Sequence, residues 1–388
     1  MKITLKRRSL WAIALLSSLF ALPVAHAGKT FKHNDTTWIS VGAGLRTSFS
    51  AIENKANDEW PTRAAIDNFR LYFNAQVHEY LKFEVNTECA DCTRGGDFIV
   101  LDAIAKFDIN DYFNLWVGLM LVPSDRAELD GPFYQNTFEF NKTPFYPSDF
   151  GSYDAGKFGR DYGFTIWGAL TPDKKLTYSF GVFRGSHENT IPDGPLLYAG
   201  RLSYNFLNVE DNPGYYTSST YYGKAGDILT LAVATQYQED GAGSAANPAD
   251  FWGISVDVLS ETVLSNEGVL TLEAEYKHFD LDGVVPNDPN RFGLFAGHAY
   301  TGTALYLFPE KIGFGQFQPY VRYTYNDPDT SSSRDEVEAG LNYIIDGHNA
   351  NIFLAYQYGD IATEGRNYAA NVNGDNVSAI KLGMQLQY

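Results

Sequence analysis

The most regular feature of this chain is an alternation of apolar and polar residues with a period of two. In the last segment, Ile380, Leu382, Met384 and Leu386 fall on one parity, and small or polar residues fall on the other. This period is typical of a β-strand that lies between an apolar phase and a wet one. The same pattern predicts sixteen strands, at 36–49, 64–77, 80–90, 98–109, 112–123, 161–171, 174–186, 196–207, 226–239, 250–263, 266–280, 294–308, 316–326, 335–346, 349–360 and 377–388.

The predicted connections are alternately very short and long. Residues 78–79 and 110–111 are two-residue connections, whereas 50–63 and 124–160 are long and polar. Tight turns alternating with long loops along an even number of strands are typical of an outer-membrane barrel, with the turns in the periplasm and the loops outside the cell. One connection, 208–225, does not fit, because its place in the order is periplasmic and yet it is long.

The apolar faces of the predicted strands are suited to contact with lipid. Strand 64–77 shows Phe69, Leu71 and Phe73 on one parity and polar residues such as Arg70 on the other. A water-soluble barrel of sixteen strands would expose these apolar faces to solvent, which is unfavourable. In lipid a closed barrel satisfies every backbone group. The sequence therefore predicts an all-β fold, a transmembrane antiparallel β-barrel of about 16 strands formed by residues 28–388 and closed by its first and last strands.

The first 27 residues have the features of a secretory signal peptide. An apolar run, Leu10–Leu22, is followed by the small-x-small pattern Ala25-His26-Ala27, where we expect cleavage. The basic residues at the start are Lys2, Lys6, Arg7 and Arg8. The apolar run is too short to span a bilayer as a helix, and no later stretch is longer. We therefore expect export to the outer membrane of a Gram-negative bacterium.

Composition limits the partners of the chain. The chain has 26 Tyr, 27 Phe and 35 Gly, which suits many strands with one wet and one apolar face. The formal net charge is −18, and removal of a leader with four cations and no acids leaves about −22. This acidity excludes nucleic acid as a partner, since phosphates require a basic surface. We expect contact with outer-membrane lipid and lipopolysaccharide instead, with divalent cations between acidic loops and the lipopolysaccharide.

The two cysteines, Cys89 and Cys92, form a Cys-x-x-Cys motif, which can indicate a metal site, a redox site, haem attachment or a disulfide bond. Haem attachment requires His after the second cysteine, where this chain has Thr93. No second cysteine pair is available for structural zinc. The oxidising compartment favours a disulfide bond between Cys89 and Cys92, and we predict no metal and no cofactor.

Three stretches resemble a known family: "NFRLYFNAQVHEYLKFEVN", "LDAIAKFDINDYFNLWVGLM" and "DYGFTIWGALTPDKKLTYSFGVFRG". Together with the strand count they resemble Gram-negative trimeric porins, and more narrowly the phosphate-selective porin O and P family. The resemblance implies a homotrimeric sixteen-stranded pore, loops folded into the lumen, and phosphate selectivity that depends on basic residues lining the channel. Tyr388 resembles the terminal aromatic residue, most often Phe, that the outer-membrane barrel assembly machinery reads.

The strand parities place charged residues in the predicted lumen. The basic candidates for the pore lining are Arg46, Arg70, Lys82, Arg322 and Lys381. All but Arg322 fall on neighbouring strands of the closed barrel and could form a basic wall. Loop 124–160 is long enough to be functional, and in porins this loop folds into the lumen. We predict that its acids Asp125, Glu128 and Asp130 face the basic wall at the narrowest point. The alternative is that the lumen charges are solvated or paired with each other.

The sequence favours a porin that allows passive diffusion of small hydrophilic solutes or ions through a water-filled channel. Because acids outnumber bases, we expect weak cation preference or poor selectivity, although a phosphate- or anion-specific channel remains an alternative. A second alternative is a barrel sheath for a periplasmic electron-transfer cytochrome. An enzyme is disfavoured, because neither Gly-x-Ser-x-Gly nor His-Glu-x-x-His occurs in the chain.

Overall fold

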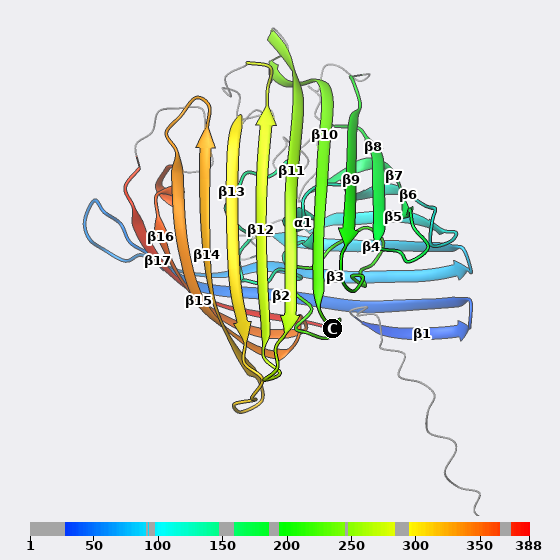
Figure 1. The fold of residues 1–388 in the computed structure, drawn as a ribbon, viewed down its shortest axis with the longest axis horizontal. Coiled ribbons are helices and arrows are strands. Elements are labelled where there is room, and N and C mark those ends of the chain that lie inside the picture. The colour runs from blue at the N-terminus through cyan, green and yellow to red at the C-terminus, as the bar shows by residue number, and fades with distance from the viewer. Residues whose placement is uncertain are drawn as a thin grey trace, which may run out of the picture.

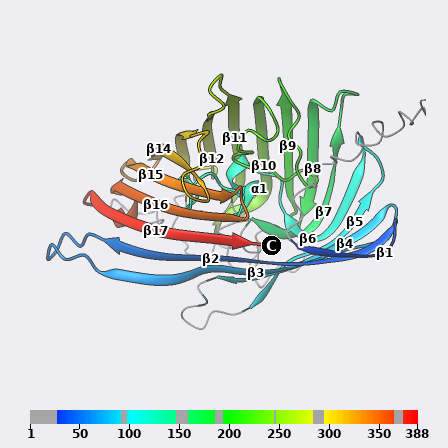
Figure 2. The same ribbon diagram turned by 90° about the horizontal axis from the view of Figure 1, so that it is seen from below.

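The computed structural model describes residues 28–90, 92, 98–146, 159–185, 194–244, 247–283, 295–364 and 374–388, and the predicted leader 1–27 lies outside them. Sixteen of the strands formed by these residues make a closed antiparallel barrel (Figures 1 and 2). The barrel strands are β2 (Thr37–Ile52), β3 (Thr62–His78), β4 (Leu81–Ala90), β5 (Ile99–Asp108), β6 (Asn114–Leu121), β7 (Arg160–Ala169), β8 (Leu176–Phe183), β9 (Leu197–Asn205), β10 (Ile228–Ser244), β11 (Asn247–Val263), β12 (Val269–Asp280), β13 (Gly297–Leu307), β14 (Gln316–Pro328), β15 (Arg334–Asp346), β16 (Ala350–Gly359) and β17 (Val377–Gln387).

Closure of the barrel follows the order that the sequence predicts. Each strand from β2 to β16 pairs with the next along the chain, and β17 pairs with β2 from Gln387↔Gly44 to Ala379↔Ile52. All sixteen predicted strands are confirmed, as is the all-β class. We call the end of the barrel with the short connections the turn end and the opposite end the loop end.

One strand was not predicted. β1 (Lys29–Asn34) pairs with the start of β2, from Lys29↔Val41 to Asn34↔Thr37. The backbone of Tyr388 exchanges hydrogen bonds of 2.8 Å with that of Ala43, so β17 ends where β1 begins along the same edge of β2. Every residue of β1 is exposed, and a strand without a buried face leaves no period of two in the sequence.

The hairpin of β10 and β11 extends further than predicted. Its pairing continues beyond the expected strand ends through Ala242↔Ala249 to Ser244↔Asn247. The polar connection 240–249 was interpreted as a loop because its composition is that of a loop, but its backbone forms ladder pairs.

The helices among the described residues are short: α1 (Arg126–Asp130) and α3 (Ile361–Glu364). None of the described helices has the length and apolarity needed to cross a membrane.

The two faces of the barrel wall have opposite polarity. On β14, the outward Val321 and Tyr323 are 49% and 46% exposed, whereas the inward Gln318 and Arg322 are 0% and 2% exposed. Apolar side chains that face outward and buried polar side chains that face inward reverse the arrangement of a water-soluble protein. This arrangement is stable when lipid surrounds the wall.

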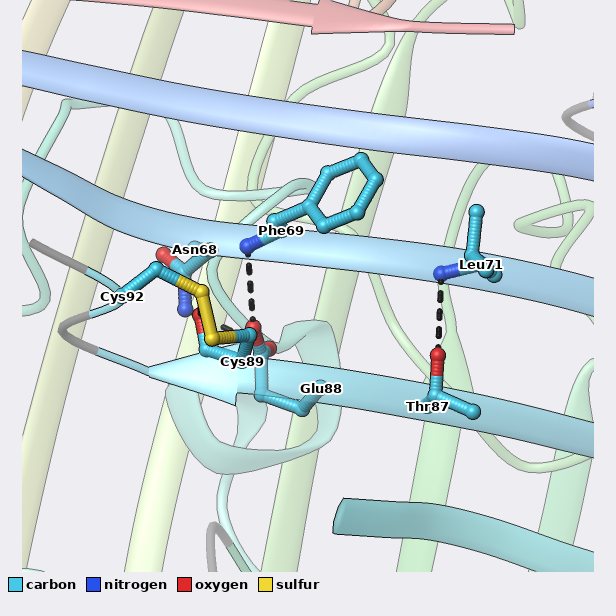
Figure 3. The surroundings of a disulfide bond; sticks show 7 residues. All are labelled: Asn68, Phe69, Leu71, Thr87, Glu88, Cys89 and Cys92. Atoms are coloured by element: carbon cyan, nitrogen blue, oxygen red, sulfur yellow. Dashed lines mark hydrogen bonds between the residues drawn. A yellow bond between two sulfur atoms is a disulfide. The ribbon is translucent and has the colours of Figure 1, made fainter. Parts of the chain in front are cut away.

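The two cysteines lie at the loop end of β4. Cys89 is the penultimate residue of β4 and forms a disulfide bond with Cys92 (Figure 3). Next to it, the backbone N–H of Phe69 donates to the Glu88 carboxylate at 3.2 Å, and that of Leu71 donates to the Thr87 hydroxyl at 3.3 Å. The bridge therefore closes a tight turn where β4 leaves the ladder.

Barrel closure predicts a specific cross-link between the first and last barrel strands. Phe49 and Leu382 are direct partners on the lipid face. Cysteines at both positions should form a disulfide bond, because directly opposed residues lie within disulfide reach. The cross-linked chain, which contains a closed loop from 49 to 382, should migrate differently from the reduced chain in denaturing electrophoresis.

A matched pair tests the register of this closure. Cysteines at Phe49 and Leu386 also lie on the lipid face, but Leu386 pairs with Leu45, four residues away on β2. A separation of about 13 Å along the strand is beyond disulfide reach. Cross-linking of both pairs, or of neither, would contradict this register.

Candidate functional site

The described part of the predicted loop 124–160 contacts side chains on the inner wall of the barrel. We call residues 122–146 the lumen segment; α1 forms part of it and lies inside the ring of strands (Figure 2). Side chains from six wall strands donate hydrogen bonds to its backbone carbonyls. The pairs are β2 to Phe138, β10 to Pro123, β12 to Pro144, β14 to Lys142, β15 to Asn136 and β17 to Phe133. Residues 147–158 of the predicted loop lie outside the described residues.

An apolar cluster anchors the start of the lumen segment. Val122 and Leu129 are buried against Trp116 of β6 and Phe183 of β8. α1 then begins at Asp125, whose carboxylate accepts a 3.0 Å hydrogen bond from the Glu128 backbone N–H as its N-cap. The local sequence therefore fixes the helix start, and burial of the apolar side chains holds the helix against the wall.

Two of the three predicted constriction acids bind a lysine on β12. Lys277 Nζ lies 2.8 Å from the Asp125 carboxylate, 3.6 Å from that of Glu128 and 3.2 Å from that of Glu275. The Lys277 side chain is fully buried. A buried ammonium requires such compensation, because an unpaired charge away from water is very unfavourable.

The third acid, Asp130, faces a different part of the chain. Its carboxylate accepts a hydrogen bond from the Ser219 hydroxyl, and one of 3.4 Å from the Gln135 amide. Asp125 and Glu128 both pair with Lys277 on β12. Contacts with β12 and with Ser219 therefore hold these acids. Their placement opposite the basic wall at the narrowest point stays a prediction.

The basic residues of β3 and β4 are paired along the wall itself. Arg70 forms an ion pair with Glu88 on β4, and Lys82 forms one of 2.9 Å with Asp108 on β5. These acids come from neighbouring strands, so the pairing follows from the register of the sheet. This is the alternative in which the lumen charges pair with each other.

Glu139 is the acid of the lumen segment that contacts the predicted basic residues. Lys381 forms an ion pair with it, and Lys142 Nζ lies 2.6 Å from its carboxylate. Arg322 donates a 3.0 Å hydrogen bond to the Glu139 backbone carbonyl and pairs with Glu338 at 2.9 Å. The sequence analysis did not select Glu139, since nothing local distinguishes it from the other acids of this loop.

Arg46 is held by neutral groups of the lumen segment. It donates a 2.9 Å hydrogen bond to the Asn68 amide oxygen and another to the Phe138 carbonyl, and its guanidinium lies 4.2 Å from the centre of the Phe138 ring. The Phe138 ring fits against Gly383 of β17, where a Cβ atom would lie only 2.5 Å from it. Glycine on the inner wall therefore makes room for the aromatic side chain.

A cavity of about 330 Å³ lies beside these contacts; we call it the outer cavity. Its charged lining combines both signs: Arg46, Lys142 and Arg160 with Asp67, Glu128 and Glu139. Glu128 and Arg46 thus share one cavity. No group of three or more possible metal-ligating side chains is found in the part of the chain that the structure describes.

The long connection that did not fit the alternation also enters the barrel. We call residues 206–227, between β9 and β10, the inner segment. Arg126 of α1 binds both carboxylate oxygens of Glu210 at 2.7 and 2.9 Å and the Ser218 carbonyl at 2.7 Å. Burial by itself would raise the pKa of Glu210, but the Arg126 guanidinium lowers it to about 2. The Ser219 backbone N–H also donates to the Tyr134 carbonyl at 3.0 Å. The inner and lumen segments therefore pack against each other inside the barrel.

His348 joins the inner segment to a short turn. Its ring lies between Tyr134 and Tyr222, with ring centres 5.1 and 5.0 Å away. Its Nε2 atom lies 3.0 Å from the Thr220 carbonyl and 3.1 Å from the Ser218 hydroxyl. A neutral ring that donates to the Thr220 carbonyl fits this buried position.

A sequence profile described as phosphate-selective porin O and P matches residues 39–388. The chain belongs to the phosphate-selective porin O and P family. A search of curated protein sequences found no match. The porin interpretation and the outer-membrane location are therefore confirmed at the level of the family, and the family indicates a channel rather than an enzyme.

Solved structures with the same fold are outer-membrane proteins of low sequence identity. OmpT of Vibrio cholerae is 12% identical, covers 93% of this chain and 100% of its own, and has a TM-score of 0.54; it is also known in a trimer form. OmpF of Salmonella typhi, in complex with daunomycin, is 14% identical over 93% of this chain and 100% of its own, with a TM-score of 0.56. OprB of Pseudomonas putida, at high pH, is 10% identical over 90% and 94%, with a TM-score of 0.58. At these identities the likeness shows the fold alone.

The buried ion cluster predicts a loss of stability on neutralisation of Asp125. Asp125→Asn removes the acid nearest to the fully buried Lys277, and breaking a buried pair should lower the free energy of unfolding by about 3 kcal/mol. Urea unfolding of the folded barrel in detergent, followed by tryptophan fluorescence, measures this loss. The control is Lys82→Gln, which breaks a pair whose side chains are 33% and 24% exposed and should cost about 1 kcal/mol or less. Equal small losses would contradict the burial argument.

The His348 contact predicts a dependence on pH. Burial, with a smaller contribution from Lys224, lowers the pKa of His348 from 6.5 to about 4. Between pH 6.5 and pH 4 the unfolded chain protonates His348 and the folded chain does not. The stability that neutral, folded His348 contributes is therefore complete above pH 6.5 and is lost as the pH falls from 6.5 to 4. The loss should total about 3 kcal/mol.

Hydrogen exchange of the inner segment at pH 7 and pH 4.5 measures this effect. Protection of residues around Thr220 should fall at the lower pH, and His348→Gln, which keeps a donor but does not titrate, should remove most of the difference. If His348→Gln kept the pH dependence of protection unchanged, groups other than His348 would be responsible for that dependence.

Proposed function

We propose that this porin allows small hydrophilic solutes and ions to diffuse with poor selectivity or a weak preference for cations. Loop 124–160 narrows the water-filled lumen, and its lumen segment forms one side of the narrowest point. Solutes pass through the part of the lumen that this segment leaves open beside its contacts with β2 and β17. Arg46, Arg70, Lys82, Arg322 and Lys381 line this passage, and Asp125, Glu128 and Asp130 hold the lumen segment in place from the opposite side.

The observation that carries this proposal is the pairing of the basic residues. Four of the five predicted pore cations have a carboxylate partner: Arg70 with Glu88, Lys82 with Asp108, Arg322 with Glu338, and Lys381 with Glu139. A paired cation presents little net positive charge to a passing anion. Because selectivity depends on the net charge around a narrow passage, neutralised cations in an acidic chain favour weak cation preference.

A phosphate-specific channel is the second candidate, and Arg46 is the observation that favours it. Its described hydrogen-bond acceptors are neutral, and it lines the outer cavity together with Arg160 and Lys142. The family name is compatible with this candidate. Asp67, Glu128 and Glu139 line the same cavity, however, and their charges oppose a bound anion.

The cytochrome-sheath alternative is less consistent with the interior of the barrel. The lumen segment and the inner segment contact each other inside the barrel. An inserted partner would have to displace both segments and break the buried contacts between Arg126 and Glu210. The passage of small solutes requires no such rearrangement.

The two termini and a related structure support proposals about the export, orientation and oligomeric state of the porin. Removal of residues 1–27 would leave β1 near the new N-terminus, and the turn end would face the periplasm. Tyr388, which is 69% exposed, would be available to the barrel assembly machinery. The trimer form of the Vibrio cholerae neighbour supports a homotrimer, and the acidic loops would bind lipopolysaccharide through divalent cations.

Reversal potentials in a KCl gradient across a planar bilayer test the selectivity. The wild-type protein should give a small potential of the sign that indicates cation preference. The variant Glu139→Gln should move it toward anions, because Lys381 and Lys142 lose their shared carboxylate. The control, Glu59→Gln, removes the same charge from an exposed position between β2 and β3 and should leave the potential unchanged.

Two results would overturn the proposal. Strong anion selectivity with block by phosphate would favour the phosphate-specific candidate. An unchanged potential in Glu139→Gln would show that Glu139 does not lie at the narrowest point.

A further inference from the structure

We propose that the turn end of the lumen contains a binding site for a neutral polyhydroxylated solute of the size of a mono- or disaccharide. The site is the cavity between the inner wall of β6–β9 and the inner segment, which we call the turn-end cavity. This inference deepens the proposed function and depends on it, because the solute reaches the cavity through the lumen.

The turn-end cavity has the size and construction of a ligand pocket. Its volume is about 480 Å³, within the usual range of about 300–1,000 Å³ for small-molecule sites. One side is a row of side chains across four strands, fixed by the pairings Asn114↔Trp167, Trp167↔Ser179 and Ser179↔Arg201. The inner segment contributes Tyr216 and its neighbours to the other side.

Three polar atoms in the lining have no partner. The Trp167 indole nitrogen, the Ser179 hydroxyl and the Tyr216 hydroxyl are buried and form no hydrogen bond with any residue that the structure describes. Ser179 is only 4% exposed. Buried polar atoms are normally hydrogen bonded, so three unpartnered atoms around one cavity point to a ligand that supplies the missing partners.

The charges around the cavity disfavour an anion. Both basic residues of the lining are already paired: Lys174 with Asp111, which also lines the cavity, at 2.8 Å, and Arg201 with Asp257 at 2.5 Å. The acidic residues in the lining outnumber them: Asp108, Asp111, Glu210 and Asp211. A phosphate or carboxylate would therefore find both cations of the lining already paired.

The unpartnered atoms also disfavour a cation. The Trp167 indole can only donate a hydrogen bond, whereas the hydroxyls of Ser179 and Tyr216 can donate or accept. A metal ion or ammonium group cannot accept from the indole, but the hydroxyl groups of a sugar both donate and accept. The Trp167 ring, which packs against Trp116 with ring centres 5.5 Å apart, adds apolar surface of the kind that lines most small-molecule pockets.

The experiment measures ion current through single channels in a planar bilayer while D-glucose, sucrose or inorganic phosphate is added on either side. The neutral sugars should block the current in a saturable manner. Ser179→Ala, Tyr216→Phe and Trp167→Phe each remove one of the three polar atoms and should each raise the half-blocking concentration by about two- to tenfold. The matched control is Tyr237→Phe on β10, because Tyr237 lies outside the cavity lining and its hydroxyl already donates to the Asp250 carboxylate at 2.9 Å.

The outcomes separate this inference from the proposed function. Absence of any conductance would contradict the porin function itself. Normal conductance without saturable sugar block, or sugar block that all three variants retain unchanged, would overturn the sugar site alone. Block by phosphate that the three variants weaken would also overturn it, in favour of an anion site. Heat-dependent migration in SDS establishes that each variant forms the barrel.

Discussion

The structure depends on one constraint, the pairing of every backbone N–H and C=O group in a wall surrounded by lipid. Hydrocarbon offers no hydrogen-bond partners, so an open sheet edge at membrane depth would be very unfavourable. The pairing of β17 with β2 removes that edge. Once the wall is closed, alternate side chains must point to lipid and to the interior, and the opposite polarity of the two faces follows.

A closed wall of sixteen strands encloses a polar interior, which this chain fills with two of its own segments. The lumen segment follows β6, and the inner segment joins β9 and β10 at the opposite end. Charged groups contribute to holding both. Lys277 binds Asp125, and Arg126 binds Glu210 and the Ser218 carbonyl. Buried ion pairs such as these fix position more than they add stability, because desolvation offsets much of their attraction.

Each of the two segments borders a cavity, and the two cavities differ in chemistry. The outer cavity is lined by charges of both signs, whereas the turn-end cavity combines aromatic rings, engaged cations and unpartnered hydroxyl and indole groups. A solute that crosses the barrel would meet these environments in succession. Four of the five predicted pore cations are paired, and the proposed passive diffusion with little charge selectivity is consistent with this pairing.

The sequence by itself determined the wall. Side chains on a strand alternate between two faces, so the period of two in segments such as 316–326 predicted both the strands and their lipid faces. The alternation of short and long connections predicted the number of strands and their order. The period of two and the lengths of the connections are local features. Each arises from the geometry of one strand and of the turn or loop that joins it to the next.

Only the tertiary structure decided which charges meet. Asp125 and Lys277 are far apart in the chain, and the acids of loop 124–160 are indistinguishable in their local sequence, so Glu139 could not be selected as the partner of Lys381. The inward path of the inner segment was missed for the same reason, whereas β1 was missed because its exposed residues show no period of two. The sequence showed that 208–225 was too long for a turn, but its position depends on Arg126 and on the burial of Tyr215 against Trp116. Contacts between distant segments leave no periodic pattern in either segment, because each partner is selected by the folded wall that brings them together.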